Sequence, residues 1–147
     1  SMGVAFSSCS VPAAGKPNFE IADDEMEFGV GIHGEPGRRR DKIKSAQEIT
    51  NELLEAINED LKPDNNEEVL LFVNGMGGTP LTELYLIFDN AKNILDKKNI
   101  KISRSLVGNY CTSLEMQGAS ITLTKLDEEL VKHWDSSVLT AAMRWGM

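Results

Sequence analysis

The chain of 147 residues lacks most of the features that mark membrane, secreted or metal-binding proteins. It has no run of about 18 apolar residues, and no basic stretch precedes an apolar one at its start, so we predict neither a membrane span nor a secretory signal. Only two cysteines occur, Cys9 and Cys111, outside any C-x-x-C spacing, which favours free thiols. We therefore expect a soluble, cytoplasmic protein with the core of one domain.

Basic residues are also scarce. The chain has 15 Lys and Arg against 23 Asp and Glu, a net charge of −8, which repels phosphate backbones and anionic lipid. We therefore expect neither nucleic acid nor membrane as a partner. His33 and His133 are the only histidines, and no cluster of His, Cys, Asp and Glu has metal-ligand spacing. The sequence predicts no metal or cofactor bound by this domain.

Hydrophobic periodicity predicts about five strands and three helices. The strands are expected within residues 3–11, 25–32, 67–74, 100–110 and 119–126, and the helices over residues 45–62, 80–97 and 127–134, with residues 33–44 as a loop. Two strands precede the first helix, so a purely parallel sheet does not fit. The pattern favours a mixed sheet with helices mostly on one face.

Helix ends can also be located from the sequence. Ser45 and Glu48 have capping-box spacing at the start of the first helix, and Pro63 closes it. Thr79 is expected to be the N-cap of the second helix, with a first-turn proline after it. The apolar stripe of that helix, from Leu81 to Leu95, is expected to pack on the sheet.

Two glycine-rich stretches resemble nucleotide-binding loops. Residues 29–34, GVGIHG, match G-x-G-x-x-G, but that fingerprint needs a helix at the turn, whereas Pro36, Gly37 and three arginines follow here. We reject the dinucleotide-binding interpretation. Residues 74–78, NGMGG, lack the Lys-Ser/Thr of a P-loop, which favours a tight turn. The alternative is a pocket wall where backbone approaches a ligand.

His33 is the main candidate for chemistry. It follows the expected strand over residues 25–32 and has glycines on both sides, so its ring can be presented at a cleft. A partly neutral imidazole can act as a base or attack a carbonyl carbon. A lone histidine is more often a structural or surface residue, and the spacing leaves both interpretations open.

The remaining polar groups are more typical of surface, turn and loop positions than of a catalytic site. His133 lies beside Trp134 with acidic neighbours and is expected at a surface or interface. The run from Arg38 to Arg40 could meet a phosphate or an acidic partner, but a solvated turn is favoured. Asp23 and Asp24 precede a strand without a partnering base, so we interpret them as part of a loop.

Four long blocks identify a family. In order they are SSCSVPAAGKPNFE, EMEFGVGIHGEPG, VNGMGGTPLTELY and SLVGNYCTSLEMQGASITLTKLD, and they span nearly the whole chain. Together they resemble the second half of the dihydroxyacetone-binding K subunit of dihydroxyacetone kinases. The resemblance implies a two-layer α/β domain whose mixed sheet has about six strands, one more than the pattern count.

The resemblance also implies a catalytic role for His33. In that family the histidine of G-I-H-G-E-P-G bonds through its ring to the carbonyl carbon of dihydroxyacetone, giving a hemiaminal. The phosphoryl group comes from ADP or ATP with magnesium on a separate L subunit or domain, which in bacterial systems is recharged by a phosphotransferase-system component. Full-length K subunits are homodimers.

This sequence departs from full-length K subunits in one respect. They have a preceding domain that supplies another histidine and an aspartate, so we interpret residues 3–147 as the C-terminal domain and Ser1-Met2 as an expression scar. The ending RWGM favours the phosphotransferase-dependent type, and the fragment alone is expected to be inactive. Two alternatives stay open: a dihydroxyacetone-sensing co-activator of a transcription regulator, and a more distant relationship to fatty-acid-binding proteins.

Overall fold

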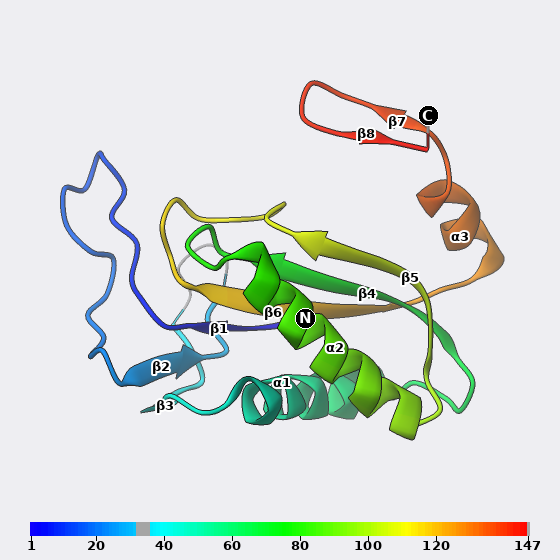
Figure 1. Ribbon diagram of the computed structural model, residues 1–147, viewed down its shortest axis with the longest axis horizontal. Coiled ribbons are helices and arrows are strands. Elements are labelled where there is room, and N and C mark those ends of the chain that lie inside the picture. Colours follow the sequence, from blue (N-terminus) through cyan, green and yellow to red (C-terminus); the bar gives the residue numbers. More distant parts are fainter. Residues whose placement is uncertain (32–35, 147) are drawn as a thin grey trace.

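One mixed six-stranded sheet organises the protein (Figure 1), whose computed structural model describes residues 1–31 and 36–146. The strands are β1 (Met2–Ala5), β2 (Glu25–Phe28), β3 (Arg39–Lys42), β4 (Glu68–Gly75), β5 (Lys101–Gly108) and β6 (Gly118–Lys125). Their order is β3-β2-β1-β6-β4-β5, with β4 and β5 parallel and every other neighbouring pair antiparallel. The predictions of a mixed sheet and of about six strands are confirmed.

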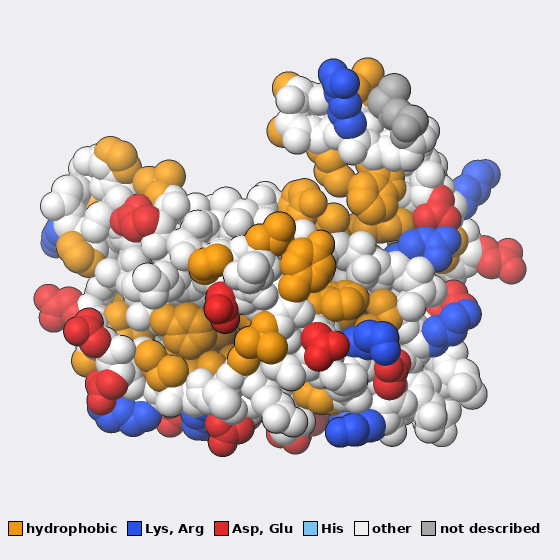
Figure 2. All heavy atoms as spheres, in the orientation of Figure 1, with side chains coloured by type: hydrophobic (Ala, Val, Ile, Leu, Met, Phe, Trp, Pro, Cys, Tyr) orange, Lys and Arg blue, Asp and Glu red, His pale blue; other side chains and the backbone are white. Residues whose placement is uncertain are grey.

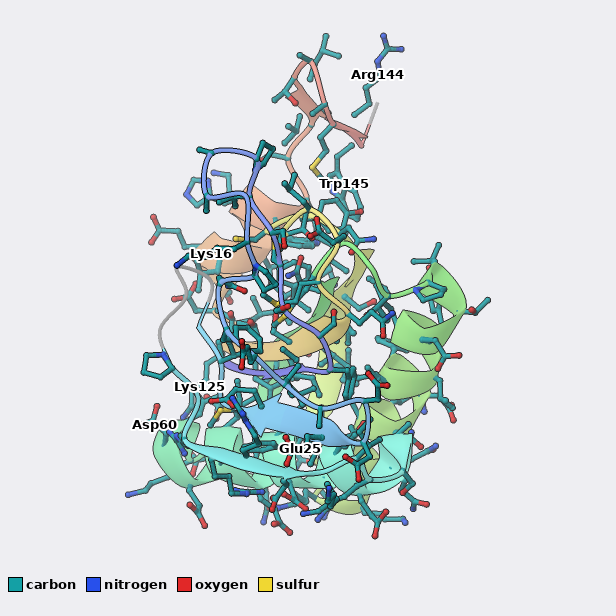
Figure 3. The ribbon with its side chains drawn as sticks, turned by 90° about the vertical axis from the view of Figure 1, so that its left-hand side faces the viewer. Lys16, Glu25, Asp60, Lys125, Arg144 and Trp145 are labelled. Atoms are coloured by element: carbon teal, nitrogen blue, oxygen red, sulfur yellow. The ribbon has the colours of Figure 1, made fainter. Side chains whose placement is uncertain are left out.

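Two helices, α1 (Ala46–Leu61) and α2 (Leu81–Lys97), cover the same face of this sheet (Figures 1 and 3). The core between them and the sheet includes fully buried Leu53, Leu84 and Leu71. Burial of apolar side chains of this size contributes about 1.5–3 kcal/mol each. Among the helices described, none is long and apolar enough to cross a membrane.

The stripe predicted for α2 is only partly buried. Leu84, Ala91 and Leu95 are inaccessible to solvent, whereas Leu81 and Tyr85 are 51% and 54% exposed. The prediction that the whole stripe packs on the sheet is therefore wrong at its start. The buried ridge runs through Leu84 and Ala91, seven residues or two turns apart, which leaves Leu81 and Tyr85 on the flank of the helix.

The start of α1 is fixed as predicted by a capping box. The Glu48 backbone N–H donates to Ser45 Oγ at 3.3 Å, and the Ser45 N–H donates to the Glu48 carboxylate at 3.0 Å. The Ser45 hydroxyl and then its backbone N–H hold the pKa of Glu48 below its usual value. The helix ends at Leu61, before Pro63.

Replacing Ser45 with alanine should lower the free energy of unfolding by about 1 kcal/mol, because one N-terminal N–H of α1 loses its acceptor. Urea unfolding followed by circular dichroism measures the change. Gln47→Ala, at an exposed position in the same turn, is the matched control and should leave stability nearly unchanged. Equal effects of the two substitutions would contradict the capping role.

Three local predictions need correction. Residues 39–42, expected in a loop, form the edge strand β3, whose four charged side chains carry no hydrophobic alternation. β2 ends at Phe28, well before His33, because Gly29 adopts φ +85° and leaves the extended conformation, although its N–H still donates to the Gly3 carbonyl at 2.7 Å. β1 likewise stops at Ala5, which leaves residues 6–24 as a long loop.

Thr79 is not the N-cap of α2; Pro80 is, without a side-chain capping bond. The Thr79 hydroxyl instead donates to the Gly118 carbonyl at 2.7 Å and accepts from the Gly118 N–H at 2.8 Å. Gly118 is the first residue of β6, so both hydrogen bonds of the Thr79 hydroxyl connect the turn before α2 to the sheet and not to α2.

A short helix and a hairpin complete the chain. α3 (Glu128–Trp134) confirms the third predicted helix, and β7 (Val138–Leu139) pairs with β8 (Arg144–Trp145) in a hairpin that was not predicted. We call residues 126–146 the arm. It extends from the end of β6 past the outer edge of β5 (Figure 1).

Candidate functional site

A cleft of about 950 Å³ opens where three loops meet at one end of the sheet. Its walls come from the loop over residues 6–24, from the connection between β2 and β3, and from the loop over residues 109–116. Gly31 and Pro36 both line it. His33, the predicted catalytic residue, lies between these two positions but outside the described residues.

Glu27 anchors the far end of the β2–β3 connection. Its carboxylate accepts from the Gly37 N–H at 3.0 Å and from Arg40 Nε at 3.1 Å, while the side chain is only 15% exposed. Arg40 also lines the cleft. A carboxylate that accepts two hydrogen bonds with little exposure gives a fixed geometry, so the segment returns to β3 at a defined point beside the cleft.

Asn74 fixes the opposite wall, and the sequence analysis did not single it out. Its side chain is buried, at 2% exposure for the residue, and it donates to the Cys111 carbonyl at 2.7 Å. Its Oδ1 accepts from the N–H groups of Tyr110 and Cys111 at 3.0 and 2.9 Å. One amide thus satisfies three backbone groups of the loop over residues 109–116.

The NGMGG stretch also supports this wall. Gly77 has φ +105°, and a Cβ there would come within 2.7 Å of the carbonyl oxygens of Ser113 and Leu114. Within this stretch only Met76 lines the cleft. The tight-turn interpretation fits, because the glycine backbone approaches the neighbouring loop.

Cys9 forms part of the third wall. It is buried, and its N–H donates to Asn18 Oδ1 at 2.9 Å. Hydrogen bonding by the Ser113 side chain and then by the Leu114 backbone lowers the pKa of the Cys9 thiol, because these interactions stabilise the thiolate. Cys111, exposed, lines the same cleft, and both cysteines are free thiols, as predicted.

The other polar residues considered as candidates lie on an exposed helix, on an edge strand and in a loop. His133 is exposed on α3, 3.7 Å from Glu129, as its surface prediction requires. Arg39 pairs with Asp41 and Glu52 and lies 4.3 Å over the Phe28 ring, and Arg40 pairs with Glu27, so these two arginines belong to the ion-paired strand β3 and not to a solvated turn. The loop assignment of residues 23–24 holds. Within the described ranges, no three His, Cys, Asp or Glu side chains could hold a metal ion.

Known protein families match this chain. The family model described as the Dak1 domain matches residues 1–142. The chain belongs to the Dak1 domain family. This Dak1 domain is 39% identical, over 99% of its own length, to the Escherichia coli protein named PEP-dependent dihydroxyacetone kinase, dihydroxyacetone-binding subunit DhaK. The predicted family is confirmed.

Solved structures carry the same fold. A protein titled dihydroxyacetone kinase operon co-activator superimposes on 92% of this Dak1 domain with a TM-score of 0.84 and 32% identity. The dihydroxyacetone kinase from C. freundii, in complex with AMP-PNP and Mg²⁺, superimposes on 89% with a TM-score of 0.70 and 28% identity. The two-layer α/β prediction is therefore confirmed.

These proteins are much longer than the Dak1 domain described here. The chain spans 48% of the E. coli relative, 42% of the co-activator and 24% of the C. freundii kinase. More than half of each is therefore outside the matched region.

Proposed function

We propose that residues 3–147 are the ketone-anchoring C-terminal domain of a dihydroxyacetone kinase K subunit. One observation carries the proposal: the residues that flank His33, Gly31 and Pro36, both line the 950 Å³ cleft. The identity to a dihydroxyacetone-binding subunit supports the substrate class. The cleft is large enough to admit a triose.

In the proposed chemistry His33 forms a hemiaminal with dihydroxyacetone. A ring nitrogen lone pair attacks the carbonyl carbon, a C–N bond forms and the C=O π bond breaks. The oxygen takes up a proton, and the ring gives up its own N–H proton, so the adduct is neutral. Glycerol has no carbonyl and is excluded. The tether also turns a bimolecular encounter into a positioned one.

The phosphoryl group, on this proposal, comes from a nucleotide with magnesium on a partner L subunit. Two findings support it: the E. coli relative is named PEP-dependent, and the C. freundii kinase structure contains AMP-PNP and Mg²⁺. A phosphotransferase-system component would recharge the nucleotide. The longer subunit would be a cytoplasmic homodimer.

A second candidate function is a dihydroxyacetone-sensing co-activator. The structural neighbour with a TM-score of 0.84 is titled an operon co-activator, and it favours this candidate. The two functions share the ketone site but differ in phosphoryl transfer. Formation of dihydroxyacetone phosphate by the longer subunit with an L subunit and a phosphoryl donor selects the kinase, and ketone binding without turnover selects the co-activator.

Carbonyl-¹³C-labelled dihydroxyacetone tests the anchoring itself. When the longer subunit is added in excess, the ketone carbonyl resonance should give way to one from a tetrahedral carbon bonded to oxygen and nitrogen. Glycerol labelled at its central carbon is the control and should show no such new species. A bound ketone whose labelled carbon stays trigonal would contradict the hemiaminal.

A further inference from the structure

The sheet has one face with no helix on it (Figure 3). Directly opposed residues of paired strands share a face, so the strand register identifies its members. On β4 and β5 they include Glu68, Leu70, Phe72, Asn74, Lys101, Arg104 and Leu106; on β6 they are Ser120, Thr122 and Thr124; and on β2 and β3 they are Glu25, Glu27, Arg40 and Lys42. On this helix-free face Leu70, Phe72 and Leu106 form an apolar stretch, which we call its apolar end, and the charged side chains of Glu68, Lys101 and Arg104 border it.

The apolar end of this face has the composition of a contact surface. An antiparallel sheet with one solvated face normally places polar side chains there, as β2, β3 and β6 do. Leu70, Phe72 and Leu106 instead remain half-buried, with no helix above them within the described residues. Apolar stripes with a polar border of this kind mark sites that another polypeptide covers.

The arm adds a second wall to the same surface. Asp135, just after α3, accepts from Arg104 through both carboxylate oxygens, at 2.7 and 2.5 Å. Because Arg104 belongs to the helix-free face, this ion pair joins the arm to that face. Trp134 and Trp145 meet edge to face at 5.7 Å and hold the hairpin against α3.

The arm has little packing of its own. No residue from 126 to 146 is buried, and Leu130 and Leu139 are 42% and 63% exposed. In Figure 2 the arm stands clear of the body, with hydrophobic side chains gathered where it joins. The polar contacts between the arm and the sheet include the Arg104–Asp135 ion pair and the Leu126 N–H, which donates to the Glu68 carbonyl at 2.9 Å. An element that exposes leucines and has so little buried surface gains stability from a partner that covers it.

We propose that the apolar end of the helix-free face and the arm together receive the remaining part of the same subunit. This inference rests on the proposed function, which makes the chain one domain of a longer subunit. The matched relatives contain at least as much chain again as this domain. A covalently linked segment reaches the surface at high effective concentration, which favours it over partners that must arrive from solution.

Hydroxyl-radical footprinting of the longer subunit and of the 147-residue chain tests the proposal. Oxidation of Phe72, Leu106 and Trp145 should be about fivefold slower in the longer subunit, because a docked domain excludes solvent from these side chains. Tyr85 and Leu86, exposed on α2, are internal controls and should be oxidised at the same rate in both. The measurement uses no ketone, so it is independent of the hemiaminal experiment.

Each other outcome overturns the proposal. Equal oxidation of Phe72 and Leu106 in both proteins would mean that nothing covers the face. Protection that rises with protein concentration, together with a larger mass by light scattering, would assign the face to a second copy. Protection that appears only when an L subunit is added would assign it to that partner.

A pair of variants gives a second readout if footprinting is obscured. Leu106→Arg should lower the unfolding temperature more in the longer subunit than in the 147-residue chain, since only the longer subunit contains the docked segment. Leu86→Arg, on the outer side of α2, should lower both by the same amount. Equal shifts for Leu106→Arg in the two proteins would contradict docking.

Discussion

His33→Ala in the longer subunit should abolish covalent retention of dihydroxyacetone and reduce phosphoryl transfer by on the order of a thousandfold or more, because the substrate loses its tether. Stability should change little, within about 0.5 kcal/mol, since the hydrophobic core is built from α1, α2 and the sheet. Labelled-ketone binding, turnover with an L subunit and thermal unfolding measure the three quantities.

His133→Ala is the matched control for this experiment. It removes the same side chain from an exposed position on α3 and should leave ketone binding and turnover unchanged. If the His33 variant still holds the ketone as an adduct stable to dilution, the assignment of the nucleophile is wrong. Loss of both ketone binding and folding would instead assign His33 a structural role.

Asn74→Ala should cost about 2–4 kcal/mol of unfolding free energy, because three backbone groups of the loop over residues 109–116 lose a buried partner. Ketone binding by the longer subunit should weaken as well, since this loop forms one wall of the cleft. Urea unfolding gives the first quantity and titration with ketone the second.

Hydrogen exchange separates local from global effects of this substitution. Amides in residues 109–116 should exchange faster in Asn74→Ala, while those of α1 should change only as far as global stability does. Asn93→Ala, at an exposed position on α2 where the amide donates to Asp89, should cost less than about 0.5 kcal/mol. A similar cost at both positions would show that Asn74 does not support the wall.

The elements that could be predicted from the sequence are those with strong local signals. α1 has a capping box, an apolar stripe and a closing proline, so both ends and the buried side follow from residues near in sequence. β4 is an apolar run ended by glycines, and it lies inside the sheet, between β6 and β5. Local propensity and tertiary packing agree in both cases.

The missed features depend on partners distant in sequence. β3 is all charged, and its strand conformation comes from backbone pairing with β2 and from ion pairs such as Arg40 with Glu27. The role of Asn74 needs a loop 36 residues further on. Neither hydrophobic periodicity nor turn chemistry records such contacts. Glycine spacing and the family resemblance indicate His33 among the polar residues, and its catalytic role stays a prediction.

The charges of β3 bear on how the sheet behaves in a crowded solution. An outer strand normally offers unpaired N–H and C=O groups to any extended peptide nearby, and this is how fibrils begin to grow. A foreign strand that paired with β3 would lie beside the cationic side chains of Arg39, Arg40 and Lys42. Its approach would break their ion pairs with carboxylates or remove water from those pairs. The charged rim is thus a barrier to aggregation, located on the side away from the arm.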